Sequence, residues 1–256
     1  MKRLLLTLTL LTHFNFAATP EQVEQYLSVS NAEEELLSLQ SQFSAMQNAF
    51  TQQDINASND NTYDMQMLSI RFKDYLQKHL SEDEMNAILE NYKNVILLQF
   101  VSASSEAEKH DQNETMVYVE QLKASPESAD RITLVEKISK ALYSKEAMVI
   151  MFDELMKPLM ENGIGGQKMS KKMLDATKKN YLKMMTEVSK AETLYASKDF
   201  TMEELEELLK IAQTPAINHE TKAVFGAMAY ALKEFFMSLA SRFDVKKHQI
   251  KELKKQ

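Results

Sequence analysis

Histidine is the residue type in this chain best suited to acid–base or metal chemistry, because the sequence contains no cysteine. Without cysteine, thiol catalysis and thiolate metal sites are excluded. Beyond the N-terminal segment the histidines are His79, His110, His219 and His248. None stands in a His-Glu-x-x-His pattern or has a second histidine three or four residues further on, so no zinc-hydrolase motif is predicted.

Two short stretches have some resemblance to ligand sites. His110, Asp111 and Glu114 could present metal ligands on one helix face, but no second ligand-bearing segment accompanies them, and a solvated helix face is the simpler interpretation. The run Gly163–Lys168 (GIGGQK) lacks the Gly-x-x-x-x-Gly-Lys-Ser/Thr spacing of a phosphate loop, and no strand precedes it. No serine lies in a Gly-x-Ser-x-Gly elbow. We therefore predict no catalytic residue, no metal site and no cofactor.

Clusters of acidic residues could bind a divalent cation. They are Glu33–Glu35 and the two pairs Glu203-Glu204 and Glu206-Glu207. Calcium sites usually add loop carbonyls to the carboxylates, whereas acidic first turns stabilise a helix without any ligand. We interpret both clusters as helix starts.

Methionine is in excess, with seventeen residues. Flexible thioethers suit surfaces that accept varied apolar partners, and they equally fill gaps between packed helices. The methionines could therefore belong to the core or line an open groove. Eight of them are concentrated in one region: Met148, Met151, Met156, Met160, Met169, Met173, Met184 and Met185.

The elements that must position these residues are helices. Gly and Pro occur four times each, well below their usual shares of about 7% and 5%. Apolar residues recur at spacings of three and four, and no alternating pattern persists, so the sequence predicts an all-α multi-helix bundle. We expect helices over 20–29, 32–50, 63–78, 82–100, 105–123, 126–142, 145–161, 168–197, 202–213 and 219–250.

Capping signals mark the ends of several of these helices. Thr214-Pro215 ends one, since proline disfavours helical geometry in the residue before it. Thr51–Thr62 and Asn162–Gln167 are loops by composition. Helix starts are predicted at Thr19 with Gln22, Asn31 with Glu34, Ser81 with Glu84, Ser125 before Pro126, and Thr201 with Glu204.

Residues 1–18 have the features of a secretory signal peptide. Lys2 and Arg3 precede an apolar stretch, Leu4–Leu11, and Ala17-Ala18 offer a small-residue cleavage site after either alanine. The stretch is too short to span a bilayer, and no other segment is long and apolar enough. An uncleaved helix on the membrane surface is the alternative. We predict a periplasmic or secreted protein without a transmembrane span.

Charge argues against nucleic acid as a partner, because the chain carries a net charge of −7 and phosphate binding needs a basic face. Residues 241–256 form a basic C-terminal tail with six basic and two acidic residues. Such a tail could contact anionic lipid or an acidic partner, but a solvated helix end is the simpler interpretation.

A predicted duplication divides the chain. Tyr75–Leu89 and Tyr195–Leu209 share the order aromatic residue, helix end, N-cap, acid and apolar stripe. We predict two related helical lobes, an N-terminal one over 19–124 and a C-terminal one over 125–240.

The run FTMEELEELLKIAQTPA, preceded by Tyr195, resembles the signature of a bacterial secreted family catalogued as domain of unknown function 2059. Ile211-Ala212 replace the aromatic pair expected there, and Ile217 stands where glycine is usual. The resemblance covers residues 130–240 well and 20–110 weakly, and it implies an all-helical exported protein without an established activity. The matching positions are Phe200, Thr201, Glu203, Glu204, Leu205, Leu208 and Thr214-Pro215-Ala216.

These observations favour an exported helical binding protein that works without a cofactor. It would present a groove between helices to a peptide, another envelope protein or an apolar ligand. One alternative is an envelope hydrolase, which requires His79 or His219 in a buried cluster with two carboxylates. The other is a structural protein that self-associates weakly through a stripe at seven-residue spacing: Phe225, Met228, Leu232, Phe235 and Leu239.

Overall fold

The structure is a computed structural model that describes residues 16–51, 61–108, 112–161 and 170–253. Within these ranges the protein is all-α, as predicted, and no strand occurs apart from an isolated bridge between Ala17 and Ser81. The α-helices are α1 (Pro20–Ser30), α2 (Ala32–Thr51), α3 (Asn61–His79), α4 (Glu82–Asn91), α5 (Val95–Glu108), α6 (Gln112–Ala124), α7 (Ala129–Leu142), α8 (Lys145–Met151), α9 (Lys157–Glu161), α10 (Lys171–Ala196), α11 (Met202–Ala212) and α12 (Pro215–Leu253).

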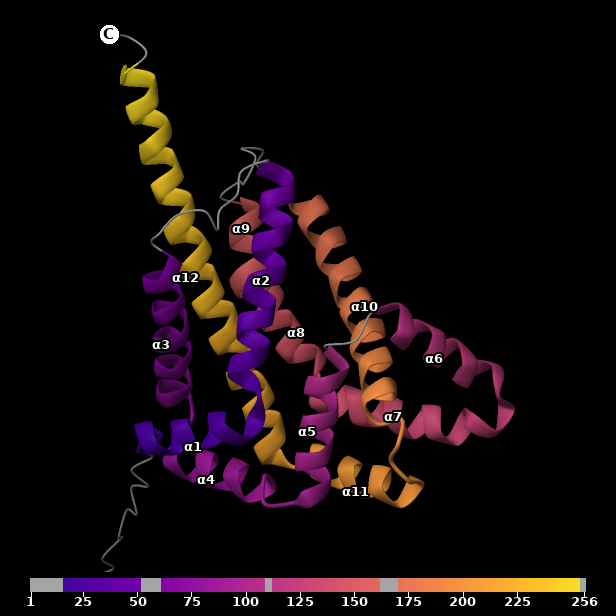
Figure 1. Cartoon of the computed structure of the whole chain (residues 1–256). Coiled ribbons are helices and arrows are strands. Elements are labelled where there is room, and N and C mark those ends of the chain that lie inside the picture. Colours follow the sequence, from indigo (N-terminus) through magenta and orange to yellow (C-terminus); the bar gives the residue numbers. More distant parts are fainter. Residues whose placement is uncertain (1–15, 52–60, 109–111, 162–169, 254–256) are drawn as a thin grey trace, which may run out of the picture.

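The long helix α12 is the element on which much of the bundle packs. In Figure 1, α3 runs along it, and α8, α4 and α7 also contact it. Its residues Met228, Leu232 and Phe235 are buried in the hydrophobic core. Three of the five residues of the stripe that the self-association alternative uses therefore belong to the core of the chain itself, and Phe225 packs against that core. The side chain of Leu239 lies outside the described residues.

Local capping chemistry explains several helix starts. The predicted capping boxes at Thr19, Ser81 and Thr201 are confirmed, since each side chain accepts a backbone N–H while the Gln or Glu three residues on accepts the cap's own N–H. Asn31 is different. It adopts left-handed geometry at φ 56° between α1 and α2, and its side-chain amide donates to the Val101 carbonyl at 3.2 Å. The helix start predicted at Asn31 is confirmed, since α2 begins at Ala32 and the Asn31 carbonyl accepts the Glu35 N–H at 3.0 Å. The side-chain amide, however, is directed to α5.

Some predicted helix bounds are wrong. The helix expected over 82–100 is two helices, because Asn94 accepts the Ile96 N–H at 2.8 Å and so starts α5 anew. Residues 105–108 end α5 instead of starting α6. The last helix begins at Pro215, since the Thr214 hydroxyl accepts the Ile217 N–H at 3.4 Å.

The helical run expected over 145–161 is confirmed, with a π-helical turn inside it at Phe152–Met156. The Lys157 N–H bonds the Phe152 carbonyl five residues back. Pro158 lacks an N–H, so it cannot donate the regular α-helical hydrogen bond to the residue four positions back. The π-helical turn therefore lies next to the position where the series of α-helical hydrogen bonds is interrupted.

The segment before α1 packs onto the start of α4. Ala18 is only 1% exposed and its N–H donates to the Leu80 carbonyl at 2.9 Å, while the Glu82 N–H donates to the Phe16 carbonyl at 2.8 Å. Residues 1–15 of the predicted signal peptide lie outside the described residues. None of the helices described is sufficiently long and apolar to cross a membrane.

The two stretches proposed to be duplicated have the same local structure. Both connect a helix end to a capping box, and the matched pairs Met85/Leu205 and Ile88/Leu208 are fully buried. One hydrophobic cluster includes residues from both predicted lobes. The duplication itself stays a prediction.

Candidate functional site

A pocket of about 110 Å³ lies where five parts of the chain meet. Its walls come from the α1–α2 junction, the residue after α4, the helix α5, the end of α7 and the first turns of α12. The left-handed Asn31 sits at this junction and ties it to α5 through Val101. Asparagine tolerates this backbone geometry better than other residues with a side chain, except glycine, so the turn that shapes the rim is encoded locally.

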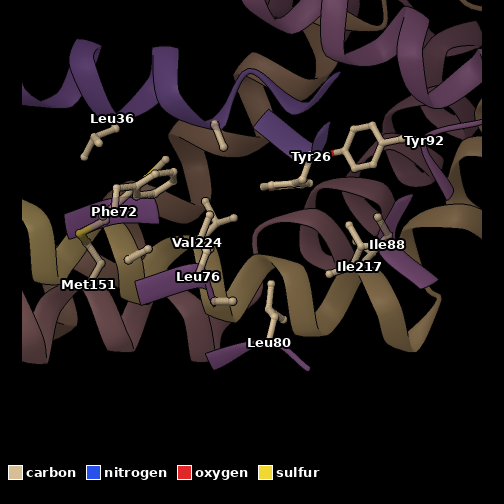
Figure 2. Packing of buried hydrophobic residues seen from close by; sticks show 14 of the residues in the cluster. Tyr26, Leu36, Phe72, Leu76, Leu80, Ile88, Tyr92, Met151, Ile217 and Val224 are labelled. Carbon is tan, nitrogen blue, oxygen red and sulfur yellow. The ribbon is translucent and has the colours of Figure 1, made fainter. Parts of the chain in front are cut away.

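The pocket wall contains a buried carboxyl group, that of Glu220 on α12. This residue is 7% exposed, although it is charged in water. Its Oε1 accepts two hydrogen bonds, from the Tyr26 hydroxyl at 2.8 Å and from the Tyr92 hydroxyl at 2.5 Å. The two tyrosine rings meet edge to face with their centroids 5.8 Å apart, at one end of the packed residues in Figure 2.

The second oxygen of Glu220 has no hydrogen-bond partner. Oε2 is buried. Among the side-chain oxygen and nitrogen atoms of the described residues, it is the one that is buried without a hydrogen-bond partner. Burial raises the pKa of Glu220 to about 7, while the two tyrosine hydrogen bonds act in the opposite direction. Burial also raises the pKa of Tyr26 and of Tyr92, and the nearby Glu220 carboxylate adds to both shifts. Both phenols are therefore fixed as hydrogen-bond donors at neutral pH.

This site was not predicted from the sequence, although one signal of it is local. Glu220 lies three residues after Ile217 and four before Val224, on the apolar face of α12, and both neighbours are buried. A carboxyl group on such a face needs a partner or a function. Its partners Tyr26 and Tyr92 are far away in sequence and have no distinctive spacing.

The histidines expected in a hydrolase site lie elsewhere. His79 is exposed and stacks on Tyr75 of its own helix, with ring centroids 3.7 Å apart. His219 is also exposed, and its Nδ1 lies 2.9 Å from Glu84 Oε1 on the surface. Neither belongs to a buried cluster with two carboxylates. His110, Asp111 and the Gly163–Lys168 run lie outside the described residues.

The acidic clusters have structural partners. Glu204 completes a capping box, and Glu207 accepts a hydrogen bond from Asn94 at 2.8 Å. Glu33 accepts one from Ser69 and lies 3.9 Å from the Lys73 ammonium, and Glu34 accepts one from Ser105 at 3.2 Å. Within the described part of the chain no three His, Asp or Glu side chains gather closely enough to hold a metal ion.

The methionine-rich region is divided between core and surface. Met148 and Met151 are buried, whereas Met173 and Met184 on α10 are exposed. None of these four lines the pocket beside Glu220. The described wall of the pocket includes no methionine, and the open groove lined by methionines stays a prediction.

Comparison with known proteins gives no family for this chain. It matches no family model, no curated protein and no solved structure. The resemblance of residues 195–216 to the secreted family of unknown function stays a prediction.

Proposed function

We propose that the protein is an exported binding protein that holds a small ligand, without a cofactor, in the pocket beside Glu220. The observation that carries this proposal is the unpartnered Oε2 of a buried carboxyl group in the wall of that pocket. A buried polar atom left unpaired costs about 1–3 kcal/mol, so a ligand that supplies a partner recovers that free energy.

The chemistry of the wall favours recognition over bond-making. Aromatic side chains and one buried carboxyl group are typical of a ligand pocket, where a few polar groups fix the orientation of a mostly apolar ligand. The described residues that line the pocket include no histidine, and Glu220 accepts hydrogen bonds from two phenols that stay protonated. The hydrolase alternative therefore has less support than a binding role.

A test can use ligand-observed NMR with three probes of similar shape: n-butylamine, n-butanol and butyrate. Ser104 lines the pocket on α5, so Ser104→Trp should block it. Ser102 is exposed on the same helix and is not part of the wall, so Ser102→Trp is the matched control. Circular dichroism verifies that both variants are folded.

We expect at least one probe to bind the wild-type protein and Ser102→Trp but not Ser104→Trp. Binding that survives in Ser104→Trp would place the ligand elsewhere. Failure of all three probes to bind at millimolar concentration would also contradict the proposal.

Export is a separate part of the proposal and has its own test. Ala18 is buried and hydrogen-bonded to the start of α4, so a cut after Ala17 keeps this contact and a cut after Ala18 removes it. We expect protein recovered from the periplasm or medium of an expressing bacterium to begin at Ala18, as measured by intact mass. Full-length protein found only inside the cell would contradict export.

A further inference from the structure

The pocket beside Glu220 is lined by acidic groups and by no basic ones. Glu34 and Glu35 on α2 contribute to its wall together with Glu220, and the described lining residues include no Lys, Arg or His. The N-terminus of α2 adds about half a positive charge from its helix dipole. Three carboxyl groups outweigh it, so the pocket favours a cation over an anion when the carboxyl groups are ionised.

Aromatic side chains also line the pocket. They are Tyr26, Tyr92, Phe100, Tyr143 and Phe225. Aromatic faces attract organic cations through the ring quadrupole and cover the carbon atoms next to the charge. A metal ion would gain little from these rings, and the described residues offer no set of three ligands to hold one. The wall therefore fits an organic cation.

We infer that the ligand is an alkylammonium ion whose N–H donates to Glu220 Oε2 while its carbon chain contacts the aromatic wall. This inference rests on the proposed function and names its ligand class. The two phenols already occupy Oε1, which leaves Oε2 as the acceptor for the ligand. A volume of about 110 Å³ suits the end of an aliphatic amine better than a whole peptide or nucleotide.

Binding of such a cation must depend on pH. The pKa of Glu220 is about 7, and an alkylamine stays protonated well above that pH. The charged or titratable groups facing this site are Tyr26 from α1, Glu34 and Glu35 from α2, Tyr92 after α4 and Tyr143 after α7. Glu220 is thus the group in the wall whose ionisation near neutral pH creates the acceptor, and affinity should rise as it ionises.

The same three probes test whether the pocket prefers an alkylammonium ion, when their affinities are measured by titration at pH 6 and pH 8. We expect n-butylamine to bind about tenfold tighter at pH 8 than at pH 6, as the ionised fraction of a group with a pKa near 7 requires. At pH 8 it should bind at least about tenfold tighter than n-butanol, since hydrogen bonds to charged groups contribute about 1.5–3 kcal/mol. Butyrate should bind most weakly.

The Glu220→Gln variant should lose about tenfold or more of the n-butylamine affinity and keep that for n-butanol. The preference among probes in the wild-type protein needs no variant, so the inference is testable even if Glu220→Gln fails to fold. If n-butanol or butyrate binds in the pocket as tightly as n-butylamine, this inference is wrong while the proposed function stands. If no probe binds, the proposed function fails first.

Discussion

Replacing Glu220 with glutamine should change how the stability of this protein depends on pH. Burial raises the pKa of Glu220 from 4.5 in the unfolded chain to about 7 in the folded protein. The native state therefore holds the proton more tightly, and this contribution to stability is fully present below pH 4.5. It is lost as the pH rises through 7 and is constant above that.

The size of this effect follows from the two pKa values. Each tenfold difference in proton affinity corresponds to about 1.4 kcal/mol, so the free energy of unfolding should fall by about 3 kcal/mol between pH 4.5 and pH 8 because of this one residue. Glutamine has the shape of the protonated acid and can still accept from Tyr26 and Tyr92. The Glu220→Gln protein should therefore match the wild type at acid pH and be more stable than it by up to about 3 kcal/mol at pH 8.

Urea denaturation followed by circular dichroism at a series of pH values measures this difference. The exposed Glu187 on α10 provides the control, because Glu187→Gln makes the same change of side chain at a solvated position. If the difference between the wild type and Glu220→Gln is the same at pH 5 and pH 8, Glu220 does not titrate as a buried group, and the reasoning fails.

Three further predictions concern packing and caps, and urea denaturation measures each. A Cβ at Gly226 would lie 2.6 Å from the Tyr75 hydroxyl oxygen, so Gly226→Ala should destabilise the wild type. In a Tyr75→Ala background it should stabilise by about 1 kcal/mol, the usual advantage of alanine over glycine within a helix. Arg131 donates to three carbonyls at and just after the end of α10, so Arg131→Ala should cost about 2 kcal/mol, of which Arg131→Lys recovers only part. Asn31→Ala should cost about 1–2 kcal/mol because alanine is strained in left-handed geometry, and Asn31→Gly should cost less.

Each of these three predictions has an outcome that would contradict it. Equal effects of Gly226→Ala with and without the Tyr75 side chain would show that the close approach is irrelevant. Full recovery by Arg131→Lys would mean that the forked shape of the guanidinium is not needed. A larger cost for glycine than for alanine at position 31 would mean that the left-handed backbone geometry does not limit which residue is tolerated there.

Most of the fold could be predicted from the sequence because its signals are local. In the capping boxes at Thr19, Ser81 and Thr201, the two side chains and the N–H groups that they bind lie within four residues of one another. The neighbouring residues therefore suffice to predict them. One error came from asparagine, which has several roles. Asn94 caps a new helix, and in the sequence this role does not differ from that of an ordinary polar position.

The candidate site could not be predicted in the same way, because it depends on distant contacts. Tyr26 lies 194 residues from Glu220 and Tyr92 lies 128 residues from it. They come together because α4 packs on α12 while α1 packs on α4. The glutamate on the apolar face of α12 was visible in the sequence, but its partners were not.

The position of α12 also has a consequence for the order in which the chain matures. The helix α12 is synthesised after α3 and α4 and supplies the buried face against which both of them pack. A nascent chain lacks that surface until α12 has been made, so α3 and α4 cannot complete their core before then. Late closure of this kind keeps the first half of the fold open for longer during synthesis than local helix formation alone would.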